Sequence, residues 1–226
     1  MKDNVIVQVP QPLIHFPLFF VANKPEEGFF YEKPNVYGDL ISIQSPRTPR
    51  MRELVVFLAG LTFIQSKECQ KCNRRVSVSI PVKQWIKTAG FGRTLKEKQS
   101  FEEAVNILSK CIFCVAVGGA LEKKAYESYS FRKRAKKLPF RKAIFPGLLG
   151  DVEFNNAGTI TVHVLLDFVE DLDVTALRVS LTHVLSMRGH ISRALTFMMY
   201  GRQSWSGTWS ELAEMVHINT WTEKWK

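Results

Sequence analysis

Positively charged side chains are concentrated in one segment of the chain, between Leu121 and Lys142. Nine of its residues are basic and only Glu122 and Glu127 are acidic, so the segment holds seven of the chain's ten net positive charges. The basic residues are Lys123, Lys124, Arg132, Lys133, Arg134, Lys136, Lys137, Arg141 and Lys142. A phosphate backbone attracts such a segment because each neutralised phosphate releases counterions. We therefore expect it to bind double-stranded DNA; the alternatives are an RNA or acidic protein partner, and a solvated loop without a partner.

The four cysteines form two pairs of equal spacing, Cys69-x-x-Cys72 and Cys111-x-x-Cys114. Two thiolates on a tight turn can share one tetrahedral zinc ion, and two pairs complete a four-thiolate site. Such a zinc ion would be structural, because four thiolates leave no position for water. Two alternatives stay open. Cys111 and Cys114 lie in the apolar run CIFCVAV, where free cysteine packs as a small core residue, and a disulfide or redox pair is the third possibility.

The residues that could take part in catalysis do not occur at the spacings of known catalytic motifs. The five histidines show no HxH or HExxH spacing, and the sequence contains no Gly-Lys-Ser/Thr phosphate loop. His163 alternates with Val162 and Val164 in a predicted strand, which favours a structural histidine. The acidic run from Asp167 to Asp173 is interpreted as a linker that caps the following helix rather than as a metal site. We expect a binding protein and not an enzyme.

Two amphipathic helices with a short turn between them are predicted in the stretch 81–111. Apolar residues recur at helical spacing, first at Val82, Trp85, Ile86 and Ala89, then at Phe101, Ala104, Val105 and Leu108. Gly90 and Gly92 end the first helix, and Thr94 and Glu97 form a capping box at the start of the second. The pattern predicts a helix-turn-helix, with an ordinary packed helical hairpin as the alternative.

The second helix of this pair carries both favourable and unfavourable charges for DNA. Lys98 and Gln99 face solvent, and Arg93 and Lys96 lie at its start, where they can contact a phosphate backbone. Three acidic residues on the same helix would repel phosphates: Glu97, Glu102 and Glu103. We therefore expect this helix to position DNA or to pack in a dimer rather than to read bases.

The remaining elements predict an α+β fold of the winged helix-turn-helix class. A Pro-rich segment, 1–47, is followed by a core helix from Thr48-Pro49 to about Gln65, and strands are predicted at 76–80, 112–117, 151–154 and 159–165. This gives a first winged-helix domain at 48–170, with the basic segment 121–142 as its wing. In that fold strands 76–80 and 112–117 flank strand 159–165, which would bring the two cysteine pairs to one end of the sheet.

A second, weaker copy of the pattern occupies residues 171–226. Apolar residues from Ile191 to Met199 mark a helix, and Thr208-x-x-Glu211 and Thr220-x-x-Glu223 are two further capping boxes. The predicted second domain is the start of a winged helix, truncated at its own recognition helix. The longest apolar run, Leu54 to Ile64, is too short to cross a bilayer, and prolines interrupt the N-terminal apolar run. We expect a cytoplasmic protein.

Four runs of sequence carry a resemblance to a known family: TPRMRELVVFLAGL, VSVSIPVKQWIKTAGFGRTLKEKQSFEEAVNILSKC, DVEFNNAGTITVHVLL and HISRALTFMMYGRQSWSGTWSELAEMVHINTWTEKWK. The chain resembles, over roughly residues 40 to 226, plasmid and phage replication initiator proteins of the tandem winged-helix type. The resemblance implies binding to repeated origin sequences (iterons), opening of the duplex, recruitment of host replication proteins and a possible homodimer. The alternative is a winged-helix transcription regulator with a structural zinc site.

Overall fold

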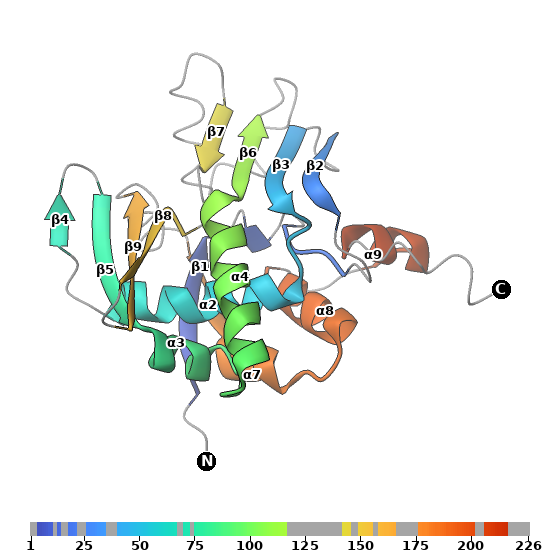
Figure 1. The fold of residues 1–226 in the computed structure, drawn as a ribbon. Helices are drawn as coiled ribbons and strands as arrows, with labels where there is room; N and C mark the ends of the chain where they lie inside the picture. The colour runs from blue at the N-terminus through green and yellow to red at the C-terminus, as the bar shows by residue number, and fades with distance from the viewer. Residues whose placement is uncertain are drawn as a thin grey trace.

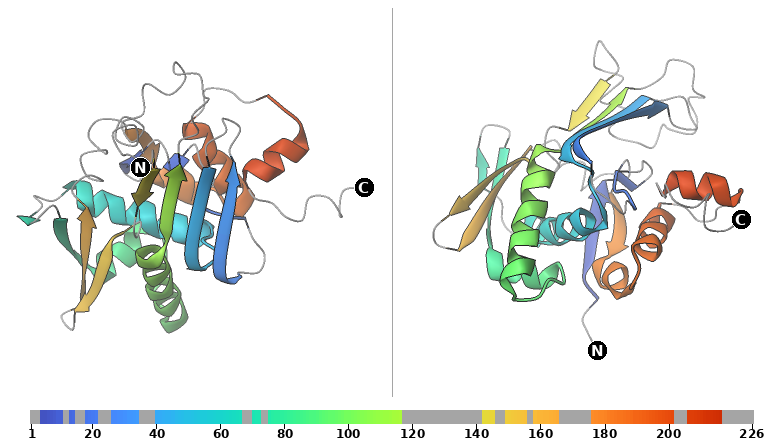
Figure 2. Two further views of the ribbon diagram at one scale, coloured as in Figure 1. Left: turned by 90° about the horizontal axis from the view of Figure 1, so that it is seen from above. Right: turned by 45° about the vertical axis from the view of Figure 1, so that its right-hand side comes forward.

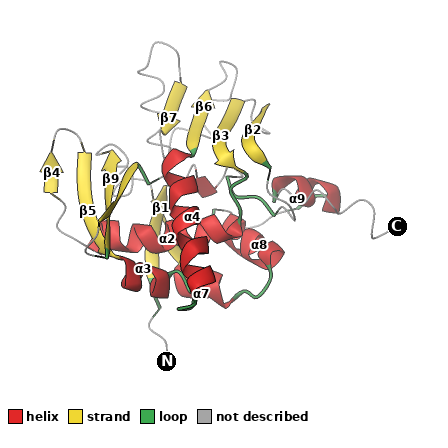
Figure 3. Cartoon of the chain, in the orientation of Figure 1, coloured by secondary structure: helices red, strands yellow, loops and turns green. Residues whose placement is uncertain are grey.

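A computed structural model describes residues 4–10, 13–14, 18–21, 26–34, 40–66, 70–72, 75–116, 142–145, 149–155, 158–165, 176–201 and 206–216. Within these ranges the chain has a mixed α/β fold whose strands pair antiparallel in three sheets (Figure 1). Most of the helices gather in the middle and the two larger sheets lie to their outside (Figure 3). Among the described helices, none combines the length and the apolar character needed to cross a membrane.

The helix α2 (Met51–Ser66) crosses the middle of the molecule and contacts β1, β5, α3, α4, α7 and α8 (Figure 2). Its residues from Leu54 to Ala59 are all buried, as expected for a helix that is apolar on most sides. The predicted start is wrong. Thr48 lies three residues before the first residue of α2, and its Oγ accepts a hydrogen bond from the Glu26 amide at 2.9 Å. At the start of the helix the Glu53 carboxylate accepts from the Arg50 amide at 2.8 Å, as the glutamate of a capping box does.

The first four-stranded sheet has the order β4-β5-β9-β8. Its strands are β4 (Gln70–Cys72), β5 (Arg75–Pro81), β8 (Asp151–Asn155) and β9 (Thr159–Leu165). Val76, Val78 and Ile80 are buried on β5, which confirms the predicted half-buried strand. The predicted β8–β9 hairpin is also confirmed: Gly158 has φ +72° and its amide donates to the Asn155 carbonyl at 3.2 Å.

The second four-stranded sheet has the order β2-β3-β6-β7 and lies apart from the first (Figures 1 and 2). Its strands are β2 (Glu27–Pro34), β3 (Leu40–Arg47), β6 (Ile112–Ala116) and β7 (Lys142–Phe145). The sequence predicted β6 as a neighbour of β9, and this is wrong: β6 pairs with β3 and β7. The run CIFCVAV is apolar throughout and shows no alternation, so its own sequence does not select the sheet or the partner strand.

The third sheet pairs the first strand of the chain with the last one described. Strand β1 (Ile6–Pro10) lies antiparallel to β10 (Ala176–Ser180), with Val7 opposite Val179. After β10 come α7 (Leu181–Ser186), α8 (His190–Tyr200) and α9 (Trp209–Met215). The helix predicted from Ile191 and the capping box at Thr208 and Glu211 are confirmed, whereas the box at Thr220 lies outside the described residues.

Candidate nucleic-acid interface

The helices α3 (Val82–Thr88) and α4 (Leu95–Lys110) form the helix pair predicted from the stretch 81–111. Trp85 of α3 is fully buried and donates its indole N–H to the Val56 carbonyl of α2 at 3.0 Å. Its ring packs edge-on against Phe101 of α4, with the ring centroids 5.4 Å apart. Gly90 ends α3 with φ +75°, a conformation that favours glycine. These contacts fix α4 against α2, so residues on the outer face of α4 are held at defined positions.

The capping box at the start of α4 is present as predicted. The Thr94 Oγ accepts from the Glu97 amide at 3.3 Å, and the Glu97 carboxylate accepts from the Thr94 hydroxyl at 2.6 Å and the Thr94 amide at 3.3 Å. The Gly92 amide donates to the same carboxylate at 3.1 Å. Hydrogen bonds from the Thr94 side chain, the Thr94 amide and the Gly92 amide hold the pKa of Glu97 below its ordinary value. Backbone donors therefore offset part of the negative charge at this helix end.

Replacing Thr94 with alanine is expected to raise the pKa of Glu97 toward its ordinary value, because the largest stabilising hydrogen bond is lost. The pKa of Glu97 is lower in the folded than in the unfolded protein. These hydrogen bonds therefore stabilise the protein fully at a pH above the ordinary pKa of a carboxyl group, and this contribution is lost as the pH falls through the lowered pKa. The variant should thus be less stable than the parent at pH 7 and approach it in acid. NMR titration of Glu97 measures the pKa, and urea denaturation at pH 7 and in acid measures the loss of stability. An unchanged pKa would contradict the role of Thr94.

The predicted contact residues around α4 are accessible. Arg93 in the α3–α4 turn and Lys96, Lys98 and Gln99 in the first turns of α4 are all exposed. Lys98 lies 3.9 Å from the Glu102 carboxylate in an i,i+4 pair, which is a weak interaction at an exposed position. Their exposure leaves them free to approach a phosphate backbone, and the positioning role stays a prediction.

Glu103 is paired with arginines from outside its helix, which the sequence analysis missed. Arg47 at the end of β3 lies 2.5 Å from its carboxylate and Arg52 of α2 lies 3.1 Å from it. Partial burial raises the pKa of Glu103, but the Arg47 hydrogen bond and the charge of Arg52 outweigh this and leave the pKa lowered. Its repulsion of phosphates is therefore smaller than the sequence alone suggested. Both arginines are more than fifty positions away in the chain, so no local pattern reveals the pairs.

The basic segment 121–142, predicted as a wing, lies almost wholly outside the described residues. Of its residues only Lys142 is described, as the first residue of β7, and Lys123 to Arg141 lie outside the described residues. The strands on either side of it, β6 and β7, pair at Ala116 and Lys142 in the second sheet, and not in the sheet that contains β5 and β9. In that other sheet β8 and β9 are joined through the turn from Asn155 to Thr159.

The described cysteines of the two pairs lie in or next to different sheets, because β6 belongs to the second sheet and not to the first. Cys72 ends β4 in the first sheet, and Cys114 lies in β6 of the second sheet, whereas Cys69 is outside the described residues. Cys111 is fully buried, and burial, with a further contribution from the charge of Glu53, raises the pKa of its thiol to about 12. Its full burial among apolar residues fits the core-residue alternative. The four-cysteine zinc site stays a prediction without support from the described residues.

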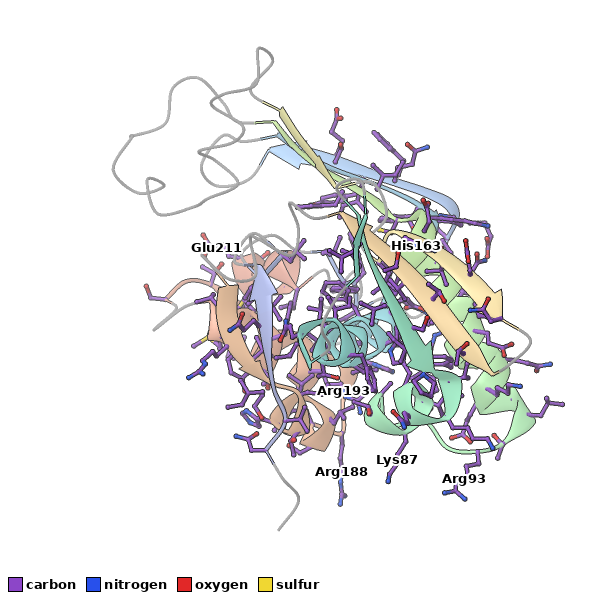
Figure 4. The ribbon with its side chains drawn as sticks, turned by 90° about the vertical axis from the view of Figure 1, so that its left-hand side faces the viewer. Lys87, Arg93, His163, Arg188, Arg193 and Glu211 are labelled. Carbon is purple, nitrogen blue, oxygen red and sulfur yellow. The ribbon has the colours of Figure 1, made fainter. Side chains whose placement is uncertain are left out.

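His163 of β9 faces the outer side of the first sheet (Figure 4). Its Nδ1 lies 2.8 Å from the Ser77 hydroxyl, in hydrogen-bond contact, and its Nε2 lies 3.4 Å from a Glu153 carboxylate oxygen. The latter is a contact between charged groups only when the imidazole is protonated, and its geometry is not that of a hydrogen bond. These three residues come from adjacent strands of one sheet, which agrees with the structural role predicted for His163.

Comparison with known proteins gives a likeness of fold only. The sequence matches no protein-family model and no curated protein. Among solved structures, the chain is similar to the crystal structure of domains 2 and 3 of RctB. The TM-score is 0.57 and the sequence identity 11%, and the match covers 93% of this chain and 78% of the RctB chain. At this identity the similarity establishes that the two chains share the arrangement of most of their elements.

Proposed function

We propose that the chain is a DNA-binding replication initiator, or a portion of one, and not an enzyme. The observation that carries the proposal is the fold shared with domains 2 and 3 of RctB over 93% of the chain, because RctB is itself a replication initiator. The resemblance found in the sequence points to the same class of protein. Fold likeness alone does not determine function, so the proposal also depends on a surface suited to DNA.

We propose further that α2, β5, α3, α4, β8 and β9 form a winged helix. Their order along the chain is helix, strand, helix, helix, strand, strand, and β9 lies between β5 and β8 in the sheet. The Val82 amide at the start of α3 donates to the Gly158 carbonyl in the β8–β9 turn at 3.0 Å, so helix pair and hairpin are joined directly. In this assignment α4 is the recognition helix and the β8–β9 turn is the wing.

The basic segment 121–142 contributes to this function as an insertion between α4 and β8. Its seven net positive charges favour phosphate contacts by counterion release whichever sheet anchors it. Partners of the protein in this proposal are double-stranded DNA, host replication proteins and a second copy of the chain. Tandem origin repeats are the expected target.

Replacing Arg132, Lys133 and Arg134 together with glutamine is expected to weaken duplex binding on all sequences alike. Three lost phosphate contacts reduce the slope of log K against log salt concentration by about 3. The measurement is fluorescence anisotropy with a labelled duplex at several salt concentrations. A matched control, Arg132→Lys, Lys133→Arg and Arg134→Lys, keeps the charge and should bind like the parent. Unchanged affinity and slope in the glutamine variant would reject this role for the segment.

A footprinting experiment tests the initiator proposal itself. Protection of tandem repeats, together with permanganate-reactive, melted DNA beside them, is the expected result. Protection of a promoter palindrome with no melting would instead favour the transcription regulator, and a binding constant that ignores salt would favour a protein-interaction module. Failure of the parent chain to bind any duplex would overturn the proposal.

A further inference from the structure

Two stretches of the described chain contain basic residues and no acidic ones. Residues 75–96 include five cations and no Asp or Glu, and residues 176–201 include three cations and no Asp or Glu. The cations are Arg75, Lys83, Lys87, Arg93 and Lys96 in the first stretch and Arg178, Arg188 and Arg193 in the second. The chain as a whole contains 21 acidic residues among 226, so a long stretch without any is a departure from its average composition. Charge in these two stretches is therefore uncompensated along the sequence.

The fold packs the two stretches against each other. A Cβ atom placed on Gly90, in the α3–α4 turn, would lie 3.2 Å from a Leu185 methyl carbon of α7, so this turn and α7 are in contact. Arg188 follows α7 by two residues, and Lys87 and Arg93 lie three residues before and after Gly90. In Figure 4 Arg188, Lys87 and Arg93 follow one another along a single edge of the molecule, and their side chains extend away from it. Residues far apart in the chain thus form one row.

The cations of this row are free of counter-charges within the described part of the chain. Lys83 precedes Lys87 by four residues on α3, so the two share one face of that helix and Lys83 joins the row. All four cations, Lys83, Lys87, Arg93 and Arg188, are exposed, and none of them forms an ion pair with another described residue. The nearest carboxylate along the chain, Glu97, is occupied by the Thr94 and Gly92 donors. Arg193 is different, because its Nε donates to the Met187 carbonyl at 2.9 Å, and it is left out of the row.

We propose that Lys83, Lys87, Arg93 and Arg188 form a phosphate-binding row that holds the backbone of a DNA duplex along this edge. The proposal rests on the proposed function and extends it, because it adds residues from α3 and from the α7–α8 turn to the interface. Each cation that neutralises a phosphate releases counterions from the DNA, and an unpaired cation can do so without first breaking an ion pair. The row lies at the end of α4 where Thr94 is found, whereas β6 and β7, the strands that flank the basic segment 121–142 in the chain, lie beyond the opposite end of α4 (Figure 1). The row is therefore tested with the basic segment left unchanged.

The test is a double replacement, Lys87→Gln with Arg188→Gln, which removes one charge from each stretch. Two lost phosphate contacts reduce the slope of log K against log salt by about 2 and weaken duplex binding in 0.1 M salt by about tenfold or more. The conservative double variant Lys87→Arg with Arg188→Lys keeps both charges and should bind like the parent. Lys110→Gln, at the other end of α4, is the control for loss of an exposed charge elsewhere. Melting curves of all variants verify that the fold is retained.

The outcomes separate this inference from the proposed function. If the parent chain binds duplex DNA and the double glutamine variant binds with the same affinity and slope, the row is wrong and the proposed function stands. If the Lys110→Gln control loses as much affinity as the double variant, general charge and not the row is responsible. If the parent binds no duplex at any salt concentration, both are overturned. Tighter binding of the parent to an RNA duplex of the same sequence, lost in the double variant, would overturn the assignment to DNA.

Discussion

An alanine in place of Glu53 is expected to lower the free energy of unfolding by about 3–5 kcal/mol. The Glu53 side chain is fully buried, and its carboxylate accepts from the Arg50 amide at 2.8 Å and from the Arg52 Nε and Nη2 at 2.9 and 2.8 Å. Its removal leaves the Arg52 guanidinium, 20% exposed, without its shortest ion pair and the start of α2 without its cap. Urea denaturation followed by circular dichroism measures the loss.

Glu103→Ala is the matched control, because it removes a carboxylate from the same network of arginines. The Glu103 side chain is 46% exposed, so water can solvate Arg47 and Arg52 on its side after the replacement. The expected loss is therefore clearly smaller than that for Glu53→Ala. Equal losses for the two variants would show that burial is not what makes Glu53 important.

Gly150→Ala is expected to lower the free energy of unfolding by about 2–5 kcal/mol, the sum of a positive-φ penalty and a steric one. Gly150 directly precedes β8 and has φ +65°. A Cβ atom there would overlap the carbonyl oxygen of His163 and lie 2.8 Å from its carbonyl carbon. Both obstacles are backbone atoms of β9, which cannot move aside like the end of a flexible side chain. The β8–β9 hairpin must therefore shift.

Gly158→Ala separates the two contributions to this loss. Gly158 lies in the β8–β9 turn with φ +72°, and a Cβ atom there would meet nothing within 4 Å. Only the positive-φ penalty of about 1–2 kcal/mol remains at that position. The difference between the two variants, measured by urea denaturation, is the steric cost at Gly150. A difference near zero would contradict the close approach of Gly150 to β9.

Elements that depend on residues close together in the sequence were predicted correctly. The alternation in β5, the Asn and Gly residues of the β8–β9 turn and the capping box of α4 each depend on residues within a few positions of one another, and the structure contains all three. Strand β2 was missed. Its sequence EGFFYEKP shows no clean alternation, and Gly28 has φ +62°, opposite Pro46, which has no amide hydrogen to donate to the pair.

Contacts between segments far apart in the chain could not be predicted from the sequence. The sheet to which β6 belongs is decided by its pairing with β3, about seventy residues earlier, and not by its own apolar residues. The ion pairs of Glu103 with Arg47 and Arg52 have the same character. For the phosphate-binding row a signal did exist, since the absence of acidic residues in 75–96 and 176–201 is visible in the sequence.

The pairing of β1 with β10 has a consequence for folding during synthesis on the ribosome. About 165 residues separate the two strands, so at ordinary rates of translation β10 is synthesised roughly ten to thirty seconds after β1. During that interval the backbone amides and carbonyls that β1 pairs with β10 have no partner strand. Completion of this sheet therefore waits for a contact between segments far apart in the chain.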